Sequence, residues 1–124
     1  MLNLNKPEPA PIRKDGETDV WPTVWADVME IPTIYATRDL VVADMKGRNQ
    51  FGWEQYGGPL TTNNGMWSLK DLYQEILDAC VYTKKALLEG DLDAVGMQTL
   101  SEIYAGLLEQ ACAVRWLIYR QVGE

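Results

Sequence analysis

Three carboxylates, a phenol and an ammonium recur at helical spacing within residues 68 to 89, SLKDLYQEILDACVYTKKALLE. At about 100° per residue, roughly one quarter of a helix circumference carries Asp71, Glu75, Asp78, Tyr82 and Lys85. The neighbouring arc of the same helix is apolar and is formed by Leu69, Leu72, Ile76, Ala79, Cys80 and Leu87. Carboxylate oxygens are the ligands that hard divalent cations take, and Mg²⁺ often combines one or two of them with waters and a substrate phosphate. The stripe therefore suggests a metal-assisted site on a helical scaffold.

Within this stripe the residues divide into metal ligands and a phosphate contact. Glu75 and Asp78 form an ExxD pair on one helical face and are the first candidates for metal ligands. Asp71, one turn earlier, could add a ligand, although helix capping competes for it. Asp44 could contribute a further metal ligand from a helix packed opposite. Lys85 would meet a phosphate oxygen as a point charge.

The same pattern has a structural interpretation. Acidic residues early in a helix and lysines in its last turns suit the helix dipole, and a polar stripe can simply face water. Tyr82 argues mildly against plain solvation, because it continues the acidic stripe with a bulky, half-apolar group. Spacing alone leaves both interpretations open.

Composition narrows the classes of function. The chain has 124 residues, a net charge of -7 and no histidine, and its pI is about 4.5. The charge disfavours direct binding to nucleic acid or to an anionic membrane. Without histidine or a CxxC motif, a structural zinc site is close to excluded, and acid-base chemistry falls to carboxylates, Lys, Tyr or metal-bound water. Cys80 and Cys112 are expected to be reduced core residues, as in a reducing cytosol.

Periodicity predicts an all-α fold. Residues 1 to 20 are proline-rich and are expected to form a flexible arm, with packing over a neighbouring subunit or a ligand as the alternative. Residues 21 to 124 are expected to form a single helical domain. Helices are expected over residues 38 to 50, over 68 to 89 with Ser68 as the cap, and from just after Asp91 to about Arg120. Gly90 ends the second of these helices, so the last two should form an antiparallel hairpin. No apolar run reaches the length of a membrane span and no signal peptide is visible, so we expect a soluble cytoplasmic protein.

A combination of motifs from about Asp39 to Glu89 resembles a known family. The motifs are R-x-x-F-G at 48 to 52, Y-G-x-P-L at 56 to 60, N-N-G at 63 to 65 and D-x-x-x-E-x-x-D-x-x-x-Y at 71 to 82. Together they resemble the compact phage and bacterial MazG-like nucleotide pyrophosphohydrolases of the all-α NTP pyrophosphatase superfamily. The arm and the last helix lie outside the resemblance.

The resemblance implies a helical bundle completed by oligomerisation, as a homodimer or homotetramer. It implies hydrolysis of a nucleoside triphosphate to the monophosphate and pyrophosphate with two or three Mg²⁺ or Mn²⁺ ions. Purine deoxynucleotides such as dGTP or dATP are the expected substrates, as in the MazZ type. Glu75 and Asp78 match the ExxD motif of the family. Larger relatives carry an EExxE on the preceding helix, which is absent here, and Asp44 and Asp39 are the available substitutes.

Further residues are expected to contact substrate. Lys85, Lys84 or Arg48 would stabilise charge on the leaving pyrophosphate. The loop from Tyr56 to Asn64 would close over the nucleotide, and Tyr82 would contact the substrate from within the stripe. Asn63 and Asn64 have donors and acceptors suited to a base edge or sugar, but Asn-Gly is also a strong turn former, and both roles stay open.

A function of another class is compatible with the same carboxylates. A small acidic helical chain can act as a non-catalytic interaction protein, such as an inhibitor or DNA mimic. In an enzyme Glu75 and Asp78 are focal and metal-dependent, whereas in a mimic the acidic residues act collectively. Single substitutions therefore discriminate between the two.

Overall fold

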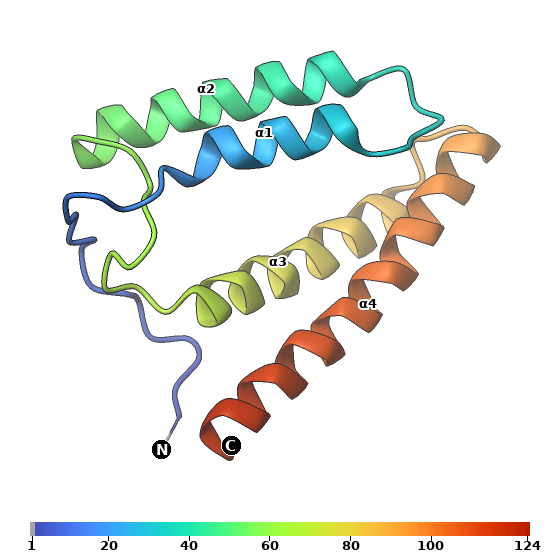
Figure 1. Cartoon of the computed structure of the whole chain (residues 1–124). Coiled ribbons are helices and arrows are strands. Elements are labelled where there is room, and N and C mark those ends of the chain that lie inside the picture. The colour runs from blue at the N-terminus through green and yellow to red at the C-terminus, as the bar shows by residue number, and fades with distance from the viewer. Residues whose placement is uncertain (1) are drawn as a thin grey trace. The chain divides into compact units, whose positions relative to one another are not determined.

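The structure is a computed structural model that describes residues 2 to 124, and these residues form four helices and no strand. The helices are α1 (Val20–Glu30), α2 (Arg38–Tyr56), α3 (Ser68–Glu89) and α4 (Ala94–Val122) (Figure 1). The predicted all-α fold is confirmed. No helix in the described range is both long and apolar enough to cross a bilayer.

The chain divides into two compact units. Unit 1 contains residues 66 to 124 together with the N-terminal segment up to Pro9, and unit 2 contains residues 10 to 65. Unit 1 therefore holds α3 and α4, and unit 2 holds α1 and α2. The predicted boundary between a flexible arm and one helical domain at residue 21 stays a prediction.

In unit 2, α1 and α2 lie side by side and run in opposite directions (Figure 1). No helix was predicted over the residues of α1, which has Pro22 in its first turn. Proline is tolerated there because the first N–H groups of a helix have no partner within the helix. The ammonium of Lys46 on α2 lies 5.6 Å from the ring centre of Trp25 on α1. This contact joins the two helices.

The end of α2 differs from the prediction. The helix continues past Gln50 through Gly52 and ends at Tyr56, and Gly57 follows in the left-handed conformation with φ 76°. The prediction placed this stretch in a loop because of its glycines. Gly57 rather than Gly52 ends the helix, because a left-handed residue terminates a helix and Gly adopts it without strain.

Two extended segments of unit 2 pair with each other beside the helices. The N–H of Val20 donates to the carbonyl of Leu60 at 2.9 Å, and that of Thr62 donates to Thr18 at 2.9 Å. These bonds surround an isolated antiparallel bridge between Asp19 and Thr61. The loop after α2 is thus held to the chain that leads into α1.

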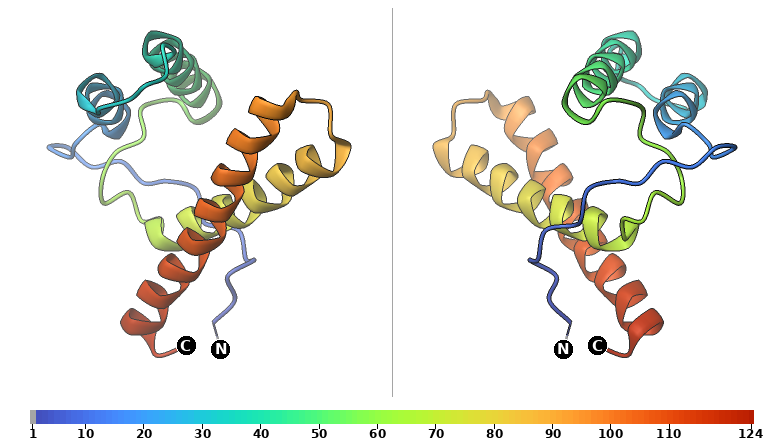
Figure 2. Two further views of the ribbon diagram at one scale, coloured as in Figure 1. Left: turned by 90° about the vertical axis from the view of Figure 1, so that its right-hand side faces the viewer. Right: turned by 90° about the vertical axis from the view of Figure 1, so that its left-hand side faces the viewer.

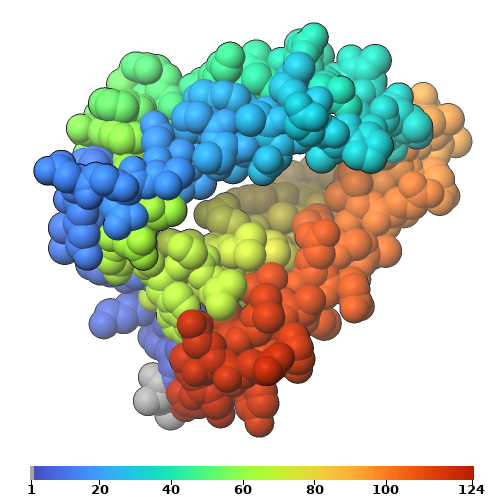
Figure 3. Space-filling view, viewed as in Figure 1, coloured from blue at the N-terminus to red at the C-terminus, as the bar shows by residue number. Residues whose placement is uncertain are grey.

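In unit 1, α3 and α4 form the predicted hairpin and pack against each other with their axes crossed (Figure 2). Side chains of α4, orange to red, lie against those of α3, yellow-green (Figure 3). The buried core consists of Ile76 from α3 with Val114 and Ile118 from α4. Cys80 packs against this cluster, whereas Cys112 is exposed. The expectation that Cys112 lies in the core was wrong, because Cys112 lines an open hollow at the surface together with Tyr73 of α3.

The ends of α3 and α4 partly follow the predictions. Gly90 ends α3 with φ 68°, as expected. The cap prediction for Ser68 was wrong, because the N-cap residue is Trp67 and no side chain caps this end. The last helix begins at Ala94, where Asp93 accepts the N–H of Gly96 at 2.7 Å. Asp93 is therefore the residue that caps α4.

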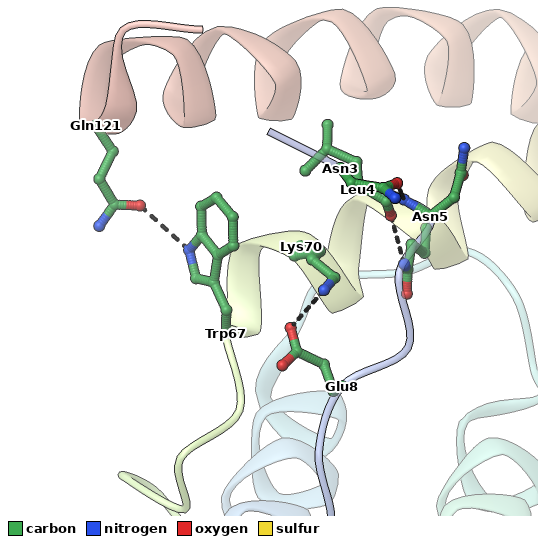
Figure 4. A network of polar contacts seen from close by, with 8 residues as sticks. Asn3, Leu4, Asn5, Glu8, Trp67, Lys70 and Gln121 are labelled. Atoms are coloured by element: carbon green, nitrogen blue, oxygen red, sulfur yellow. Dashed lines mark hydrogen bonds and ion pairs between the residues drawn. The ribbon is translucent and has the colours of Figure 1, made fainter. Parts of the chain in front are cut away.

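The N-terminal segment of unit 1 runs beside α3 (Figure 4). Leu2 and Leu4 pack against the core cluster, and Gln74 of α3 donates a hydrogen bond to the carbonyl of Leu4. Glu8 forms an ion pair with Lys70 at 3.3 Å. Both ends of the segment thus contact α3. The mobility expected of residues 1 to 20 stays a prediction, and Met1 lies outside the described residues.

Candidate functional site

The carboxylates of Glu75 and Asp78 lie one helical turn apart on α3, and both residues are exposed. Among residues 2 to 124, neither forms an ion pair. Each retains its full set of acceptor positions toward solvent. A pair of exposed carboxylates at this spacing is suited to a divalent cation that keeps part of its water shell.

Asp71 differs from the other two carboxylates because it is half-buried. Burial raises the pKa of Asp71, and the nearby charges of Glu8 and Glu75 raise it further, against the opposing effect of Lys70. A ligand must lose its proton before it binds a metal. The raised pKa thus weakens Asp71 as a metal ligand in acid.

The basic residues of α3 lie further along the same helix and have partners of their own. The ammonium of Lys85 forms an ion pair with Glu89 at 2.9 Å. The ammonium of Lys84 lies 5.5 Å from the ring centre of Tyr104 on α4. Tyr82 is exposed. Lys85 would have to exchange Glu89 for a phosphate oxygen, which costs little because an exposed helical ion pair is weak.

A shallow apolar hollow of about 530 Å³ lies beside these lysines in unit 1. Lys84 and Lys85 line it together with Val81, Leu88 and Tyr104. No carboxylate of the ExxD pair lines this hollow. It is therefore a feature separate from the acidic face.

Asp44, Arg48 and Tyr56 all lie on α2, in unit 2. Asp44 is exposed and has no ion pair within the described range. The guanidinium of Arg48 lies 5.2 Å from the ring centre of Phe51. Asp39, the other substitute for a first-helix ligand, lies in the first turn of α2. A metal site that joins Asp44 or Asp39 to the α3 carboxylates stays a prediction.

The two asparagines of the N-N-G motif have structural partners in unit 2. Asn63 is in the left-handed conformation with φ 51°, and its side-chain amide donates to Glu17 at 2.9 Å. The Thr62 hydroxyl donates to the same carboxylate at 2.6 Å, and these two bonds lower the pKa of Glu17. Asn64 is buried, and its carbonyl accepts the N–H of Ile12 at 2.8 Å. Both residues thus take part in the turn, whatever contact they also make with a ligand.

A pocket of about 190 Å³ lies in unit 2. Arg48 and Tyr56 line it, as do four residues that sequence reasoning had not assigned to a site: Trp21, Asn49, Phe51 and Gln55. The signal was present in the sequence, because the spacing of residues 48, 52, 55 and 56 places them on one face of a helix. The mistaken end of α2 at Gln50 concealed it.

Within residues 2 to 124, no group of three or more His, Cys, Asp or Glu side chains is arranged to hold a metal ion. The donors on the acidic face of α3 are a pair, with half-buried Asp71 beside it. A pair is sufficient for Mg²⁺ when waters and phosphate oxygens complete the coordination. Metal binding here would therefore depend on the substrate.

No protein-family model matches the chain, and no curated protein or solved structure matches it. The resemblance to MazG-like enzymes consequently rests on the four motifs between residues 48 and 82.

Proposed function

We propose that the chain is a metal-dependent nucleoside triphosphate pyrophosphohydrolase of MazG-like type. It would convert a nucleoside triphosphate, preferably a purine deoxynucleotide such as dGTP or dATP, to the monophosphate and pyrophosphate. The observation that carries the proposal is the pair Glu75 and Asp78, which is exposed, unpaired and one turn apart on a helix fixed by its opposite side. The motif resemblance supplies the reaction class.

The donor set is compatible with Mg²⁺ or Mn²⁺. Glu75 and Asp78 would hold the metal ions, with Asp71 and Asp44 as further ligands. When bound, such ions supply activation of water and neutralisation of phosphate charge, which suits a chain without histidine. All the protein donors in this set are carboxylate oxygens, as hard cations prefer.

The remaining assigned residues would orient the triphosphate. Lys85, after leaving Glu89, would place its ammonium against a phosphate oxygen, and Lys84 would do so from the adjacent position. Arg48 would provide a further cation from α2. Tyr82 continues the exposed stripe of α3 and would contact the sugar or a phosphate. We further propose a cytoplasmic homodimer or homotetramer.

The alternative is a non-catalytic acidic interaction protein. The observation that favours it is the exposed apolar surface of the α3 and α4 hairpin, which includes the hollow beside Val81 and Leu88. A partner protein could cover such a surface. In this case the carboxylates of α3 would contribute only to the overall negative charge.

The test is hydrolysis of the eight common ribo- and deoxyribonucleoside triphosphates with Mg²⁺, Mn²⁺ or EDTA, with the products resolved. We expect metal-dependent release of monophosphate and pyrophosphate. Glu75→Gln should abolish turnover and leave the helical content unchanged. Glu109→Gln is the matched control, because Glu109 is also an exposed carboxylate on a helix of unit 1. Equal activity of the two variants would refute the role of Glu75, and no turnover by folded wild-type protein would favour the interaction protein.

A further inference from the structure

The pocket of unit 2 lies where the N-terminal half of the unit meets the second half of α2. Pro11 and Arg13 line one side, Trp21 comes from the start of α1, and Pro59 follows α2. Its volume of about 190 Å³ is below the usual range for drug-sized ligands, which begins near 300 Å³. A ligand group that fills it is therefore about one ring system in size.

The charge of the lining is opposite to that of the protein. The chain has 18 acidic and 11 basic residues, yet two arginines and no acidic residue line the pocket. Arg48 forms no ion pair with any residue from 2 to 124. Its guanidinium lies over the Phe51 ring, 5.2 Å from the ring centre, so its charge is not neutralised by a carboxylate. Such a guanidinium at the edge of an apolar pocket favours a ligand that has an anionic group next to an apolar ring.

Arg13 has a different role, because it fixes one side of the pocket. Its Nε donates to the carbonyl of Pro59 at 3.0 Å, and its Nη2 donates to that of Tyr56 at 2.8 Å. A Cβ added to Gly58 would lie 2.8 Å from the guanidinium carbon, so the group lies flat against the glycine backbone. The position of the side that contains Tyr56 and Pro59 is thus fixed without a ligand.

Aromatic rings and a glycine shape the interior for a flat ring. Trp21, Phe51 and Tyr56 contribute aromatic rings to the lining. Stacking on aromatic rings is a general way in which proteins hold nucleobases. Gly52 also lines the pocket, and a Cβ built on it would meet no atom within 4 Å. The glycine thus leaves space for a ligand that a side chain would occupy.

The polar side chains of the lining can bond to the edge of a heteroaromatic ring. Asn49 and Gln55 each carry an amide with donors and an acceptor. An apolar ligand that displaced water from these amides, above all from the half-buried Asn49, would leave them without partners, which is costly. A nucleobase has ring nitrogens and exocyclic groups that would satisfy them.

From this combination of rings, amides and a cation that has no ion pair among residues 2 to 124, we infer that the pocket binds the base of a nucleotide, with Arg48 contacting its phosphate. The inference rests on the proposed function only for the choice of a nucleotide among ring-bearing anions. The pocket would act as the subsite that selects the base, through Asn49 and Gln55.

The test measures binding of nucleoside monophosphates in EDTA, so that metal-dependent events are absent. The probes are dGMP, dAMP, dCMP and TMP, and ribose 5-phosphate serves as an anion without a base. The NMR signal of the Trp21 indole N–H, assigned by its loss in Trp21→Phe, reports occupancy. We expect this signal to shift with at least one monophosphate and not with ribose 5-phosphate.

Two matched pairs of variants locate the site. Phe51→Ala should weaken binding at least about fivefold, the lower end of the effect of removing a stacked ring. Trp53→Ala should leave it unchanged, because Trp53 is an exposed ring on the same helix outside the pocket. Gly52→Ala should weaken binding while raising helix stability, and Gly47→Ala should raise stability alone, because neither added Cβ meets another atom.

The outcomes separate this inference from the proposed function. Binding that is lost in Phe51→Ala and Gly52→Ala, in a protein without turnover, would support the pocket and refute the enzyme. Turnover with an unchanged KM in both variants would support the enzyme and refute the pocket. Equal binding of ribose 5-phosphate, or equal effects of Phe51→Ala and Trp53→Ala, would also overturn the inference.

Discussion

Removal of the Glu8 carboxylate is the sharpest test of how unit 1 is held together. The Glu8 and Lys70 side chains are only 10% and 9% exposed, and their charged atoms lie 3.3 Å apart (Figure 4). Glu8→Ala would leave the ammonium of Lys70 buried without its partner. The loss of one member of a buried ion pair typically costs about 3 to 5 kcal/mol of unfolding free energy.

Two features of the site place the expected loss below this range. Asp71 lies near Lys70 and provides some remaining attraction. The segment that carries Glu8 can also detach from α3, which would return Lys70 to water and limit the loss to the free energy of docking residues 2 to 9. Leu2 and Leu4 oppose detachment through their contacts with the core cluster. We therefore expect a loss of about 2 to 3 kcal/mol for Glu8→Ala.

The measurement is urea unfolding followed by far-UV circular dichroism, with hydrogen exchange of the α3 amides to report on unit 1 by itself. Glu89→Ala is the matched control, because the Lys85 and Glu89 side chains are 66% and 50% exposed. An exposed helical pair of this kind contributes about 0.5 kcal/mol or less. Glu8→Ala combined with Lys70→Met should be more stable than Glu8→Ala alone, because no unpaired ammonium remains. Equal losses in Glu8→Ala and Glu89→Ala would refute the reasoning.

Three further predictions concern α3 and α4. Burial raises the pKa of Asp71 in the folded state, so ionisation of this side chain lowers the stability of the fold. Asp71→Asn should therefore gain stability relative to wild type as the pH rises above about 3.9, the pKa of Asp in the unfolded chain. Unfolding measured at a series of pH values would contradict this if the difference between the two proteins did not change with pH. Gly90→Ala should lower the unfolding free energy by about 1 kcal/mol because residue 90 has a φ of 68°. Gly106→Ala should raise it by about 0.5 to 1 kcal/mol, because Gly106 lies inside α4 and the added Cβ meets no atom within 4 Å. Thermal unfolding would contradict this if both changes had the same sign. Ile118→Val should cost about 1 kcal/mol because Ile118 is 0% exposed, and Leu117→Val, at 43% exposed, should cost less than half as much in urea unfolding.

Local patterns predicted those parts of the fold that depend on neighbours in sequence. Helical periodicity identified α3 and α4, and Gly90 marked the end of α3 because a glycine with positive φ is a local requirement. Ile76 was on the predicted apolar arc and is buried. Leu72 was on the same arc and is exposed, because periodicity shows which side of a helix is apolar but not how much of it a partner covers.

Features that depend on distant segments could not be predicted in this way. Nothing near Glu8 indicates that it will meet Lys70, and nothing near Arg13 indicates the carbonyls of Tyr56 and Pro59. The capping prediction for Ser68 relied on a common local pattern that is not formed here. For the candidate site, the carboxylates of α3 were predictable from spacing, whereas the pocket of unit 2 combines residues from four separate stretches of the chain.

The position of the ExxD pair on α3 follows from contacts made elsewhere on the helix. Ile76 points about 130° away from the pair around the helix and packs between Val114 and Ile118. At its N-terminal end the helix is fixed by Lys70, through Glu8, and the indole N–H of the preceding Trp67 donates to Gln121 of α4 at 3.2 Å (Figure 4). The backbone that carries the carboxylates is thus held by groups that leave the carboxylates themselves free. This arrangement suits a binding site, because carboxylates on a rigid helix keep their spacing while their oxygens stay available to a ligand.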